Sequence, residues 1–590
     1  MSDLKIGGAT TLAWRDGTIL IEGVILRVGN ETGAGALARL VQLIEQDGPA
    51  ALARVEGDFV ALIKTPGALH AFKSFTSQFQ LYYREGAGHV SGHVSGHVSN
   101  RLFPFWRSDE DTWNEDYFAR HVLIVPGYQF ISRETPIRNV NRVLPGELVT
   151  IGRNVTRDQL VHRDYKYRFE GGATRQEAAE QILHLLRDSI KSRLAARPQS
   201  RICVEISGGL DSSFIACLLG EATSGIRGVM FSQPGVPSHV VSEGYAREVA
   251  QRYGIDLAVV PPEDLPAPPL GTAPYCDEPS DFFWFGDIFS RGVAQWAEPN
   301  SYVFTGFGAD QLFLRSPAIL PNLLKDRQLT VFCPSLSAAS AMLSRSRFSI
   351  AWQSAISQLP ADLHRRLQRA SSVTGWNPWD VSDVNMKRTL THEVAWVRCG
   401  KGLDAYSSER REAEKSLVGN GILCDDWGYF SAPRVVTQGH FCQKGLLDAS
   451  PFCDLPLLDF TYDHISALMV HDFGGRYKEL LRDAQKGIVP ETLRNRQNDT
   501  FVFNSFQMKY VDQQRERFEN YLNGADEAWV DKRGAREALQ QLSFGMTTSS
   551  TRSVLALMGY LQWKDSFLSH CAAPVQNDDA SYFEALASNE

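Results

Sequence analysis

The sequence lacks the paired cysteines that mark disulfide frameworks and many metal sites. Its 590 residues include nine cysteines, an odd number, and no two of them form a Cys-x-x-Cys pair. Scattered cysteines of this kind are typical of reduced thiols in an intracellular enzyme. The sequence therefore favours a cytoplasmic location.

Long apolar runs and an excess of basic charge are missing as well. No apolar segment approaches the roughly 18–20 residues that span a bilayer. The first residues, MSDLKIGGATTLAW, show no basic segment followed by an apolar one, so we expect no secretory signal. A net charge of −8 argues against a dominant nucleic-acid surface. We expect neither a membrane nor nucleic acid among the partners.

What is present predicts two domains, since the chain is too long for one ordinary core. Residues 1–165 contain β-branched and aromatic stretches such as TILIEGVILRV, which predict an antiparallel β-rich domain with a helix near 34–46. Residues 170–590 begin with alternating strand and helix patterns, including a helix over 242–253. This alternation predicts an α/β domain with a parallel sheet. From about 335 onward helical patterns dominate.

A short repeat, GHVSGHVSGHVS at 88–99, is the one low-complexity segment. Its histidines, His89, His93 and His97, recur every fourth residue and would share one face of a helix or strand. A metal site would need more ligands, and no carboxylate or cysteine completes the set. We interpret the repeat as a tandem expansion of a surface hairpin.

The tract EISGGLDSS at 205–213 carries the clearest chemistry. An apolar strand runs into two glycines and then into a helix, so backbone N–H groups and the helix N-terminus can bind phosphate. Asp211 would repel a bare phosphate and makes sense if Mg²⁺ lies between them. The Walker A pattern is absent. The predicted phosphate-binding residues are Ser207, Gly208, Gly209, Leu210, Asp211, Ser212 and Ser213.

The SGGLDSS tract resembles the pyrophosphate loop of ATP pyrophosphatases, in particular of the asparagine synthetase and β-lactam synthetase group. Further segments resemble that group in the same order along the chain. They are 229–254 with Ser232 and Glu243, DEP at 277–279, FTGFGADQLF at 304–313, SPFCDLPLLD at 450–459 and YKELLR at 477–482.

This resemblance implies an ATP- and Mg²⁺-dependent enzyme. Asp310 would be the second Mg²⁺ ligand beside Asp211, and both follow strands of one parallel sheet, at whose carboxyl ends ligands bind. A substrate carboxylate would attack the α-phosphate to give an acyl-adenylate, which an amine then converts into an amide. The implied catalytic residues are Asp211, Asp310, Lys478 and Arg482, and the implied further nucleotide contacts are Ser232, Gly306, Phe307 and Gly308.

The first domain resembles the glutaminase domain of asparagine synthetases, an Ntn-type αββα fold. The segments VEGDFVALI (55–63), FQLYYRE (79–85) and VNRVLPGELVTI (140–151) carry this likeness. In those enzymes the nucleophile is a cysteine at position 2, whereas this chain has Ser2. We therefore expect a degenerate glutaminase-like domain that generates no ammonia.

Two further departures concern the synthetase domain. Phe307 stands where the family has Glu or Tyr to help deprotonate the nucleophile, and phenylalanine cannot do so. Asn498 stands where the family often has a lysine that stabilises developing negative charge. The candidates to supply that charge are Lys478, Arg482, Arg496 and Lys509.

With these departures the chain looks most like the lasso-peptide macrolactam synthetases. They adenylate an Asp or Glu side chain of a precursor peptide and join it to the peptide's N-terminal amine. The resemblance implies a precursor peptide, a leader-binding protein and a leader peptidase as partners. Three alternatives stay open: a β-lactam or carbapenam synthetase, an amidotransferase fed by free ammonia, and a non-catalytic scaffold that keeps ATP.

Overall fold

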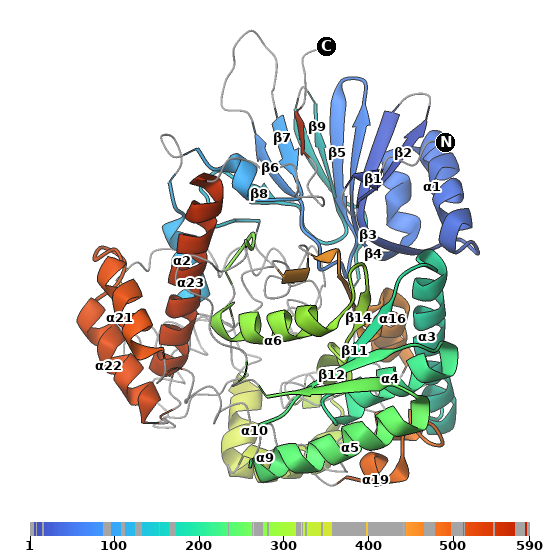
Figure 1. Cartoon of the computed structure of the whole chain (residues 1–590), viewed down its shortest axis with the longest axis vertical. Coiled ribbons are helices and arrows are strands. Elements are labelled where there is room, and N and C mark those ends of the chain that lie inside the picture. Colours follow the sequence, from blue (N-terminus) through green and yellow to red (C-terminus); the bar gives the residue numbers. More distant parts are fainter. Residues whose placement is uncertain are drawn as a thin grey trace.

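The computed structural model shows β-sheets in the N-terminal part of the chain and helices around a parallel sheet in the rest (Figure 1). It describes residues 5–6, 9–14, 17–85, 96–107, 112–123, 133–152, 154–163, 173–233, 235–261, 264, 275–279, 283–313, 320, 323–324, 327–343, 346–356, 397–398, 440–441, 444–464, 478–496, 511, 514–544, 546, 549–572 and 584–586.

Two antiparallel sheets and two helices form the N-terminal sandwich, a name we keep for this unit. The first sheet has the order β1 (Lys5–Ile6), β2 (Ala9–Trp14), β3 (Gly17–Val28), β4 (Val55–Thr65), β5 (Ala68–Lys73), β9 (Glu147–Ile151) and β10 (Val155–Gln159). The second has the order β16 (Glu584–Leu586), β7 (Gly96–Ser99), β6 (Tyr82–Glu85) and β8 (Asn141–Arg142). Strand β16 comes from the far end of the chain and pairs with β7.

Side-chain alternation along β4 explains why the two sheets stack. Phe59, Ala61 and Ile63 point into the core shared with helix α1 (Gly33–Asp47), whereas Val60 and Leu62 point into the core between the sheets. A strand with apolar residues on both faces must be covered on both sides. The predicted helix near 34–46 is confirmed as α1.

Helix α2 (Glu115–Leu123) covers the outer face of the second sheet. On β6, Tyr83 points into the core between the sheets, whereas its neighbour Tyr82 packs in one cluster with Tyr117 and Phe118 of α2. The layers therefore run helix, sheet, sheet, helix. This order confirms the predicted αββα architecture.

The second unit is built on a five-stranded sheet in which every neighbouring pair is parallel. Its order is β13 (Asp256–Val260), β12 (Arg227–Phe231), β11 (Ile202–Glu205), β14 (Tyr302–Phe304) and β15 (Leu447–Ala449). The helices that follow its strands are α4 (Leu210–Ala222), α5 (Pro237–Tyr253), α6 (Phe283–Trp296) and α7 (Ala309–Phe313). The alternating pattern in the sequence thus predicted the parallel sheet correctly.

Helix α5 begins earlier than the sequence prediction of residue 242. It starts at Pro237, whose fixed φ suits the first position of a helix. It ends at Gly254 in the left-handed conformation, a common way to close a helix. The apolar pattern found the body of the helix and missed its polar first turn.

Helix α3 (Arg175–Ala196) lies between the two units. It begins with a capping box between Thr174 and Glu177 and packs against β3 of the sandwich as well as α4 of the second unit. One continuous hydrophobic core therefore reaches from the first antiparallel sheet to the parallel sheet.

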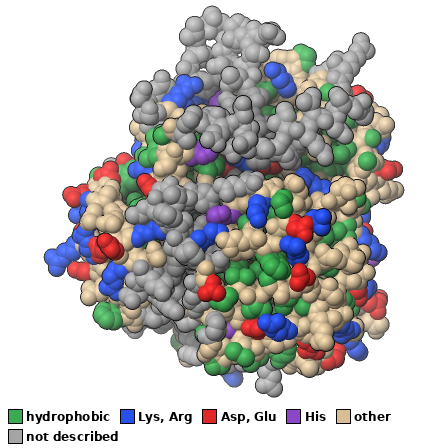
Figure 2. Space-filling view, in the orientation of Figure 1, with side chains coloured by type: hydrophobic (Ala, Val, Ile, Leu, Met, Phe, Trp, Pro, Cys, Tyr) green, Lys and Arg blue, Asp and Glu red, His purple; other side chains and the backbone are tan. Residues whose placement is uncertain are grey.

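The remaining described helices surround this frame. They are α9 (Leu329–Leu343), α10 (Arg347–Ile356), α16 (Leu455–His464), α18 (Glu479–Ala484), α19 (Glu491–Arg494), α21 (Arg515–Gly524), α22 (Lys532–Ser543) and α23 (Ser549–Ala572). The long helix α23 packs beside α2 (Figure 1). No helix in the described part of the chain is long and apolar enough to cross a membrane. On the face shown in Figure 2, basic and acidic side chains are interspersed.

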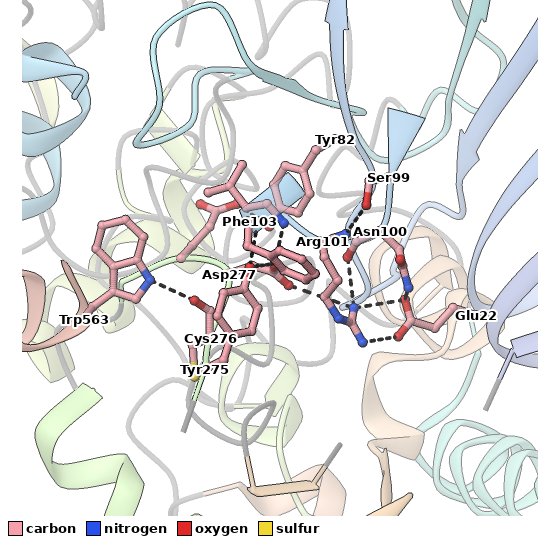
Figure 3. A network of polar contacts seen from close by, with 12 residues as sticks. Glu22, Tyr82, Ser99, Asn100, Arg101, Phe103, Tyr275, Cys276, Asp277 and Trp563 are labelled. Carbon is pink, nitrogen blue, oxygen red and sulfur yellow. Dashed lines mark hydrogen bonds and ion pairs between the residues drawn. The ribbon is translucent and has the colours of Figure 1, made fainter. Parts of the chain in front are cut away.

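A buried polar network, here called the joint, connects the two units (Figure 3). Arg101 of the sandwich donates to Glu22 Oε1 at 3.1 Å, and its guanidinium also lies 3.9 Å from Asp277 Oδ2. Asp277 Oδ1 in turn accepts the backbone N–H of Leu102 at 2.6 Å. Because all three charged side chains are buried, each depends on the others to offset the loss of water.

The neighbouring Glu278 completes the joint. Its carboxylate accepts hydrogen bonds from Arg142 at 2.6 Å, Tyr82 at 2.9 Å and Tyr117 at 3.0 Å, all from the sandwich. Burial raises the pKa of Glu278, while Arg142 and the two hydroxyls act in the opposite direction. The DEP motif at 277–279 therefore holds the second unit onto the sandwich.

Candidate active site

At the carboxyl end of the parallel sheet, the loop 207–209 leads into α4, and the loop 305–308 packs closely against the first turn of that helix. Gly208 has a φ of +70°, and a Cβ on it would lie 2.0 Å from the carbonyl oxygen of Ser242. A Cβ on Gly306 would lie 2.5 Å from the backbone nitrogen of Ser212. A side chain on Gly208 would therefore push the loop 207–209 away from α5, and one on Gly306 would push the loop 305–308 away from the first turn of α4.

The serines of the first loop order it from within. Ser212 Oγ accepts the backbone N–H of Ser207 at 3.0 Å, and Ser207 Oγ accepts the N–H of Gly209 at 3.3 Å. Gln485 donates to the carbonyl of Leu210 at 3.0 Å. Ser213 Oγ is buried and has no hydrogen-bond partner among the described residues. Such a hydroxyl suits a ligand oxygen at this helix N-terminus.

Two carboxylates converge on one cation above the loop. Asp211 lies in the first turn of α4 and Asp310 in the first turn of α7. The ammonium of Lys478 contacts Asp211 Oδ2 and lies 2.6 Å from Asp310 Oδ1. Lys478 adopts a left-handed φ of +53° immediately before α18, a conformation that non-glycine residues rarely take and that often marks functional sites.

The paired carboxylates fit a magnesium ion. Mg²⁺ prefers oxygen ligands and commonly binds one or two carboxylates together with phosphate oxygens and water. Within the described residues, no group of three or more His, Cys, Asp or Glu side chains could hold a metal. Asp211 and Asp310 would hold the ion together with polyphosphate oxygens, and their contacts with the ammonium of Lys478 show that the pair accepts positive charge.

A comparison with protein-family models matches residues 181–565 to the model described as asparagine synthase. The chain belongs to the asparagine synthase family. Membership indicates ATP-dependent formation of a carbon–nitrogen bond, since this family uses ATP. A comparison with curated proteins gives no match.

Several solved structures are similar over part of the chain. Glutamine phosphoribosylpyrophosphate amidotransferase from B. subtilis, complexed with ADP and GMP, is 12% identical, with 42% of this chain and 72% of that chain covered and a TM-score of 0.17. The U34-tRNA thiolase NcsA from Methanococcus maripaludis, with its 4Fe-4S cluster, is 14% identical, with 47% and 91% covered and a TM-score of 0.18. The fold assignment itself rests on the topology described above.

In this asparagine synthase family member, Arg482 contacts the loop 207–209 indirectly, through Arg496. Its side chain is 1% exposed and donates to the backbone carbonyls of Arg494 and Arg496. Arg496 then donates to the carbonyl of Gly208 at 2.7 Å and stacks over the ring of Tyr245. The sequence predicted Arg482 as catalytic, and the geometry gives it a positioning contact two steps away from the phosphate loop.

The other predicted contacts lie around the same edge of the sheet. Ser232 donates to Glu243 Oε2 at 3.1 Å. Phe307 is 40% exposed, and its backbone N–H donates to Thr305 Oγ1. Gly308 has a φ of +95°, which closes the loop before α7. The positions Ser2, Asn498 and Lys509, and the histidines His89 and His93 of the repeat, lie outside the described residues.

Sequence reasoning missed two residues of this region, Gln485 and Glu205. Gln485 is fully buried against the loop, and nothing in its sequence context marks it. Glu205 is the last residue of β11, in the middle of the sheet. A signal for it existed, because a carboxylate is unexpected in the otherwise apolar strand ICVEI.

Proposed function

We propose that the protein catalyses ATP-dependent macrolactam formation. It would adenylate the side-chain carboxylate of an Asp or Glu in a precursor peptide and join it to the peptide's α-amine, releasing AMP and pyrophosphate. The observation that carries the ATP-dependent part is the pair Asp211 and Asp310 converging on one cation beside the loop 207–213. Family membership supports the ligase class.

For the first step, the chain supplies phosphate binding and charge. The N–H groups at the start of α4 and the hydroxyl of Ser213 bind oxygens of the departing pyrophosphate. Mg²⁺, when bound, neutralises charge that develops on the leaving group. Asp211 and Asp310 would hold the ion, and Lys478 places a further positive charge beside them. These interactions stabilise charge where it develops, which is usually the largest catalytic contribution.

For the second step, the amine is the point at which this chain departs from its family. Phe307 offers no group that accepts a proton. An α-amine titrates near pH 8, so roughly a tenth or more of it is neutral at neutral pH without help. A peptide N-terminus is therefore a suitable nucleophile, and the partners we propose are that peptide, a leader-binding protein and a leader peptidase in a cytoplasmic pathway.

Synthetic peptides with a free N-terminus and a single Asp or Glu, placed at each position in turn, test this function. The expected result is pyrophosphate release and a cyclic product for one placement. The matched control is the same peptide with an acetylated N-terminus, which should still be adenylated and should not cyclise. Absence of pyrophosphate release from every peptide would overturn the macrolactam proposal.

The same assay separates the alternatives. Product formed only when ammonium is added would favour an ammonia-dependent amidotransferase. Turnover of a small amino-acid derivative and of no peptide would favour a β-lactam or carbapenam synthetase, although those enzymes carry Tyr where this chain has Phe307. ATP binding without turnover of any carboxylate would favour a scaffold.

A further inference from the structure

Glu205 is the one charged residue in the central strand of the parallel sheet. It closes β11, and its neighbours Cys203 and Val204 are fully buried and apolar. Two residues later, at Ser207, the phosphate loop begins. Because a strand advances about 3.3 Å per residue, the Cα atoms of Glu205 and Ser207 are about 7 Å apart. Glu205 therefore stands at the edge of the sheet where ligands of such folds bind.

The side chain of Glu205 points to the face that α6 covers. Val204 packs in the core on the α4 side, whereas Cys203 packs with Val293 of α6. By alternation Glu205 shares the face of Cys203. Burial raises the pKa of the Cys203 thiol, and the charge of Glu205 raises it further. On this face Glu205 is separated from the helix α4 that carries Asp211.

A short polar row continues from Glu205 across the sheet. Since Val204 pairs with Phe304, Glu205 lies beside Thr305 in the same register. Thr305 Oγ1 lies 3.0 Å from Ser450 Oγ at the end of the next strand, and it also accepts the N–H of Phe307. An acid and two hydroxyls thus line the edge of the sheet next to Phe307.

Glu205 forms no hydrogen bond or ion pair within the described structure. Its side chain stays partly exposed, but the protein surrounds it closely enough that burial raises its pKa to about 7. Charged or titratable side chains that share this face by strand register are Cys203, Arg227, Asp256 and Asp448. Helix α6, which packs against the face, adds Arg291. Arg227 is held by Glu298 at 3.0 Å, and burial alone accounts for the Glu205 shift. A largely surrounded carboxyl group that forms no hydrogen bond or ion pair lowers the stability of the fold. Carboxyl groups with pKa values shifted in this way concentrate at functional sites.

We propose that Glu205 is the general base for the attacking amine, in the place that Phe307 cannot fill. This proposal rests on the proposed function. The neutral amine nitrogen attacks the carbonyl carbon of the acyl-adenylate, and the new C–N bond replaces the C–O bond to AMP, which leaves with the electron pair. The carboxylate of Glu205 accepts the proton that the nitrogen loses and later returns it to solvent. A base whose pKa lies near the working pH serves this step best.

The test measures the two half-reactions separately in Glu205→Gln, with the peptide that the wild type cyclises. Carboxylate-dependent exchange of pyrophosphate into ATP should change by less than about threefold, while cyclisation should fall about 100-fold or more. Glu205→Asp should recover part of the loss. The matched control is Glu221→Gln, at the opposite end of α4 and paired with Arg187, which should change neither half-reaction.

Hydroxylamine, used as a substitute nucleophile, distinguishes loss of a base from structural damage to the site. Structural damage would lower hydroxamate formation as well, whereas loss of the base alone would not. After hydroxylamine attacks, its protonated nitrogen is much more acidic than that of an α-amine, so water can accept the proton without help from Glu205. With the N-acetylated peptide, Glu205→Gln should form the hydroxamate at nearly the wild-type rate. A loss of exchange and of hydroxamate formation together, or full cyclisation by Glu205→Gln, would overturn the role of Glu205.

A substrate-free measurement separates failure of this proposal from failure of the proposed function. Infrared difference titration of wild type against Glu205→Gln should show one carboxyl group that titrates near pH 7. Its absence would overturn the proposal even if peptides are cyclised. If the carboxyl group titrates as expected but the wild type adenylates no peptide, the proposed function has failed. The role of Glu205 as the base for a peptide amine is then overturned with it.

Discussion

Two clusters in this protein each place one cation between two carboxylates, and they differ in what they leave open to solvent. At the joint, the side chains of Arg101, Glu22 and Asp277 are 6%, 7% and 2% exposed. Every charge there is enclosed. The side-chain amide of Asn100 donates to Glu22 Oε2 at 2.9 Å, and the backbone N–H of Leu102 donates to Asp277 Oδ1 at 2.6 Å. Such a cluster has no room for a ligand and holds two units together.

In the candidate active site the cation is equally buried, but its partners are open. The side chain of Lys478 is 0% exposed, whereas Asp211 is 19% and Asp310 is 55% exposed. A carboxylate that faces solvent beside a phosphate-type loop can exchange its partner for a ligand-bound ion. Accessibility of the anions, more than the presence of an ion pair, therefore distinguishes a binding cluster from a structural one.

The largest effect should come from breaking the joint with Arg101→Met. Glu22 and Asp277 would then be two buried carboxylates without their shared cation, which costs about 3–5 kcal/mol. Urea unfolding should show this loss in the free energy of unfolding. The double variant Arg101→Met, Glu22→Gln should recover part of it. A loss below about 1 kcal/mol would show that the joint is not needed for stability.

Asp211→Asn should give the next largest effect, and on activity alone. Pyrophosphate release should fall about 100- to 1,000-fold, because an amide offers weaker charge to a metal ion and the developing transition state. The fold should persist, since Lys478 keeps its contact with Asp310 at 2.6 Å. Circular dichroism and the unfolding midpoint serve as controls. Near-normal pyrophosphate release would contradict the role assigned to Asp211.

Glu205→Gln should change the pH dependence of stability. The carboxyl titrates near 4.5 in the unfolded chain and about 7 in the folded protein, so the folded state binds the proton more tightly between these values. The contribution of this carboxyl group to the free energy of unfolding should therefore be fully present below pH 4.5 and be lost as the pH rises through 7.

Without that carboxyl, Glu205→Gln should exceed the wild type by about 1–3 kcal/mol above pH 7 and match it near pH 4. Urea unfolding at both pH values measures the difference. A variant that is less stable than the wild type at high pH would mean that Glu205 has a cationic partner in the folded protein.

The smallest effect should come from Arg187→Met, which removes an exposed pair. Arg187 lies 2.8 Å from Glu221, with 41% and 33% of the two side chains exposed. Solvent screens such a pair, and we expect a loss below about 1 kcal/mol in urea unfolding, without an effect on activity. A loss as large as that of Arg101→Met would remove the distinction between enclosed and open ion pairs.

Much of the fold could be predicted because it follows from local patterns. Alternating strands and helices indicated the parallel sheet, and Gly208 together with the residues after it indicated the phosphate loop. The joint could not be predicted, because Asp277 and Glu278 meet Arg101 and Arg142 across more than 130 residues of chain. The first turn of α5 was missed because it is polar and carries no periodic apolar residue.

The family, the parallel sheet and the loop 207–213 can be inferred from the sequence alone, because short-range spacing of glycine, serine and apolar residues encodes them. Which charges meet, in contrast, depends on the tertiary structure. It placed Lys478 between Asp211 and Asp310, packed Arg482 against the backbone carbonyls of Arg494 and Arg496, and gave Glu205 no hydrogen bond or ion pair among the described residues. Partners of this kind depend on how distant segments pack, and burial then decides whether a charge stabilises the fold or remains available for chemistry.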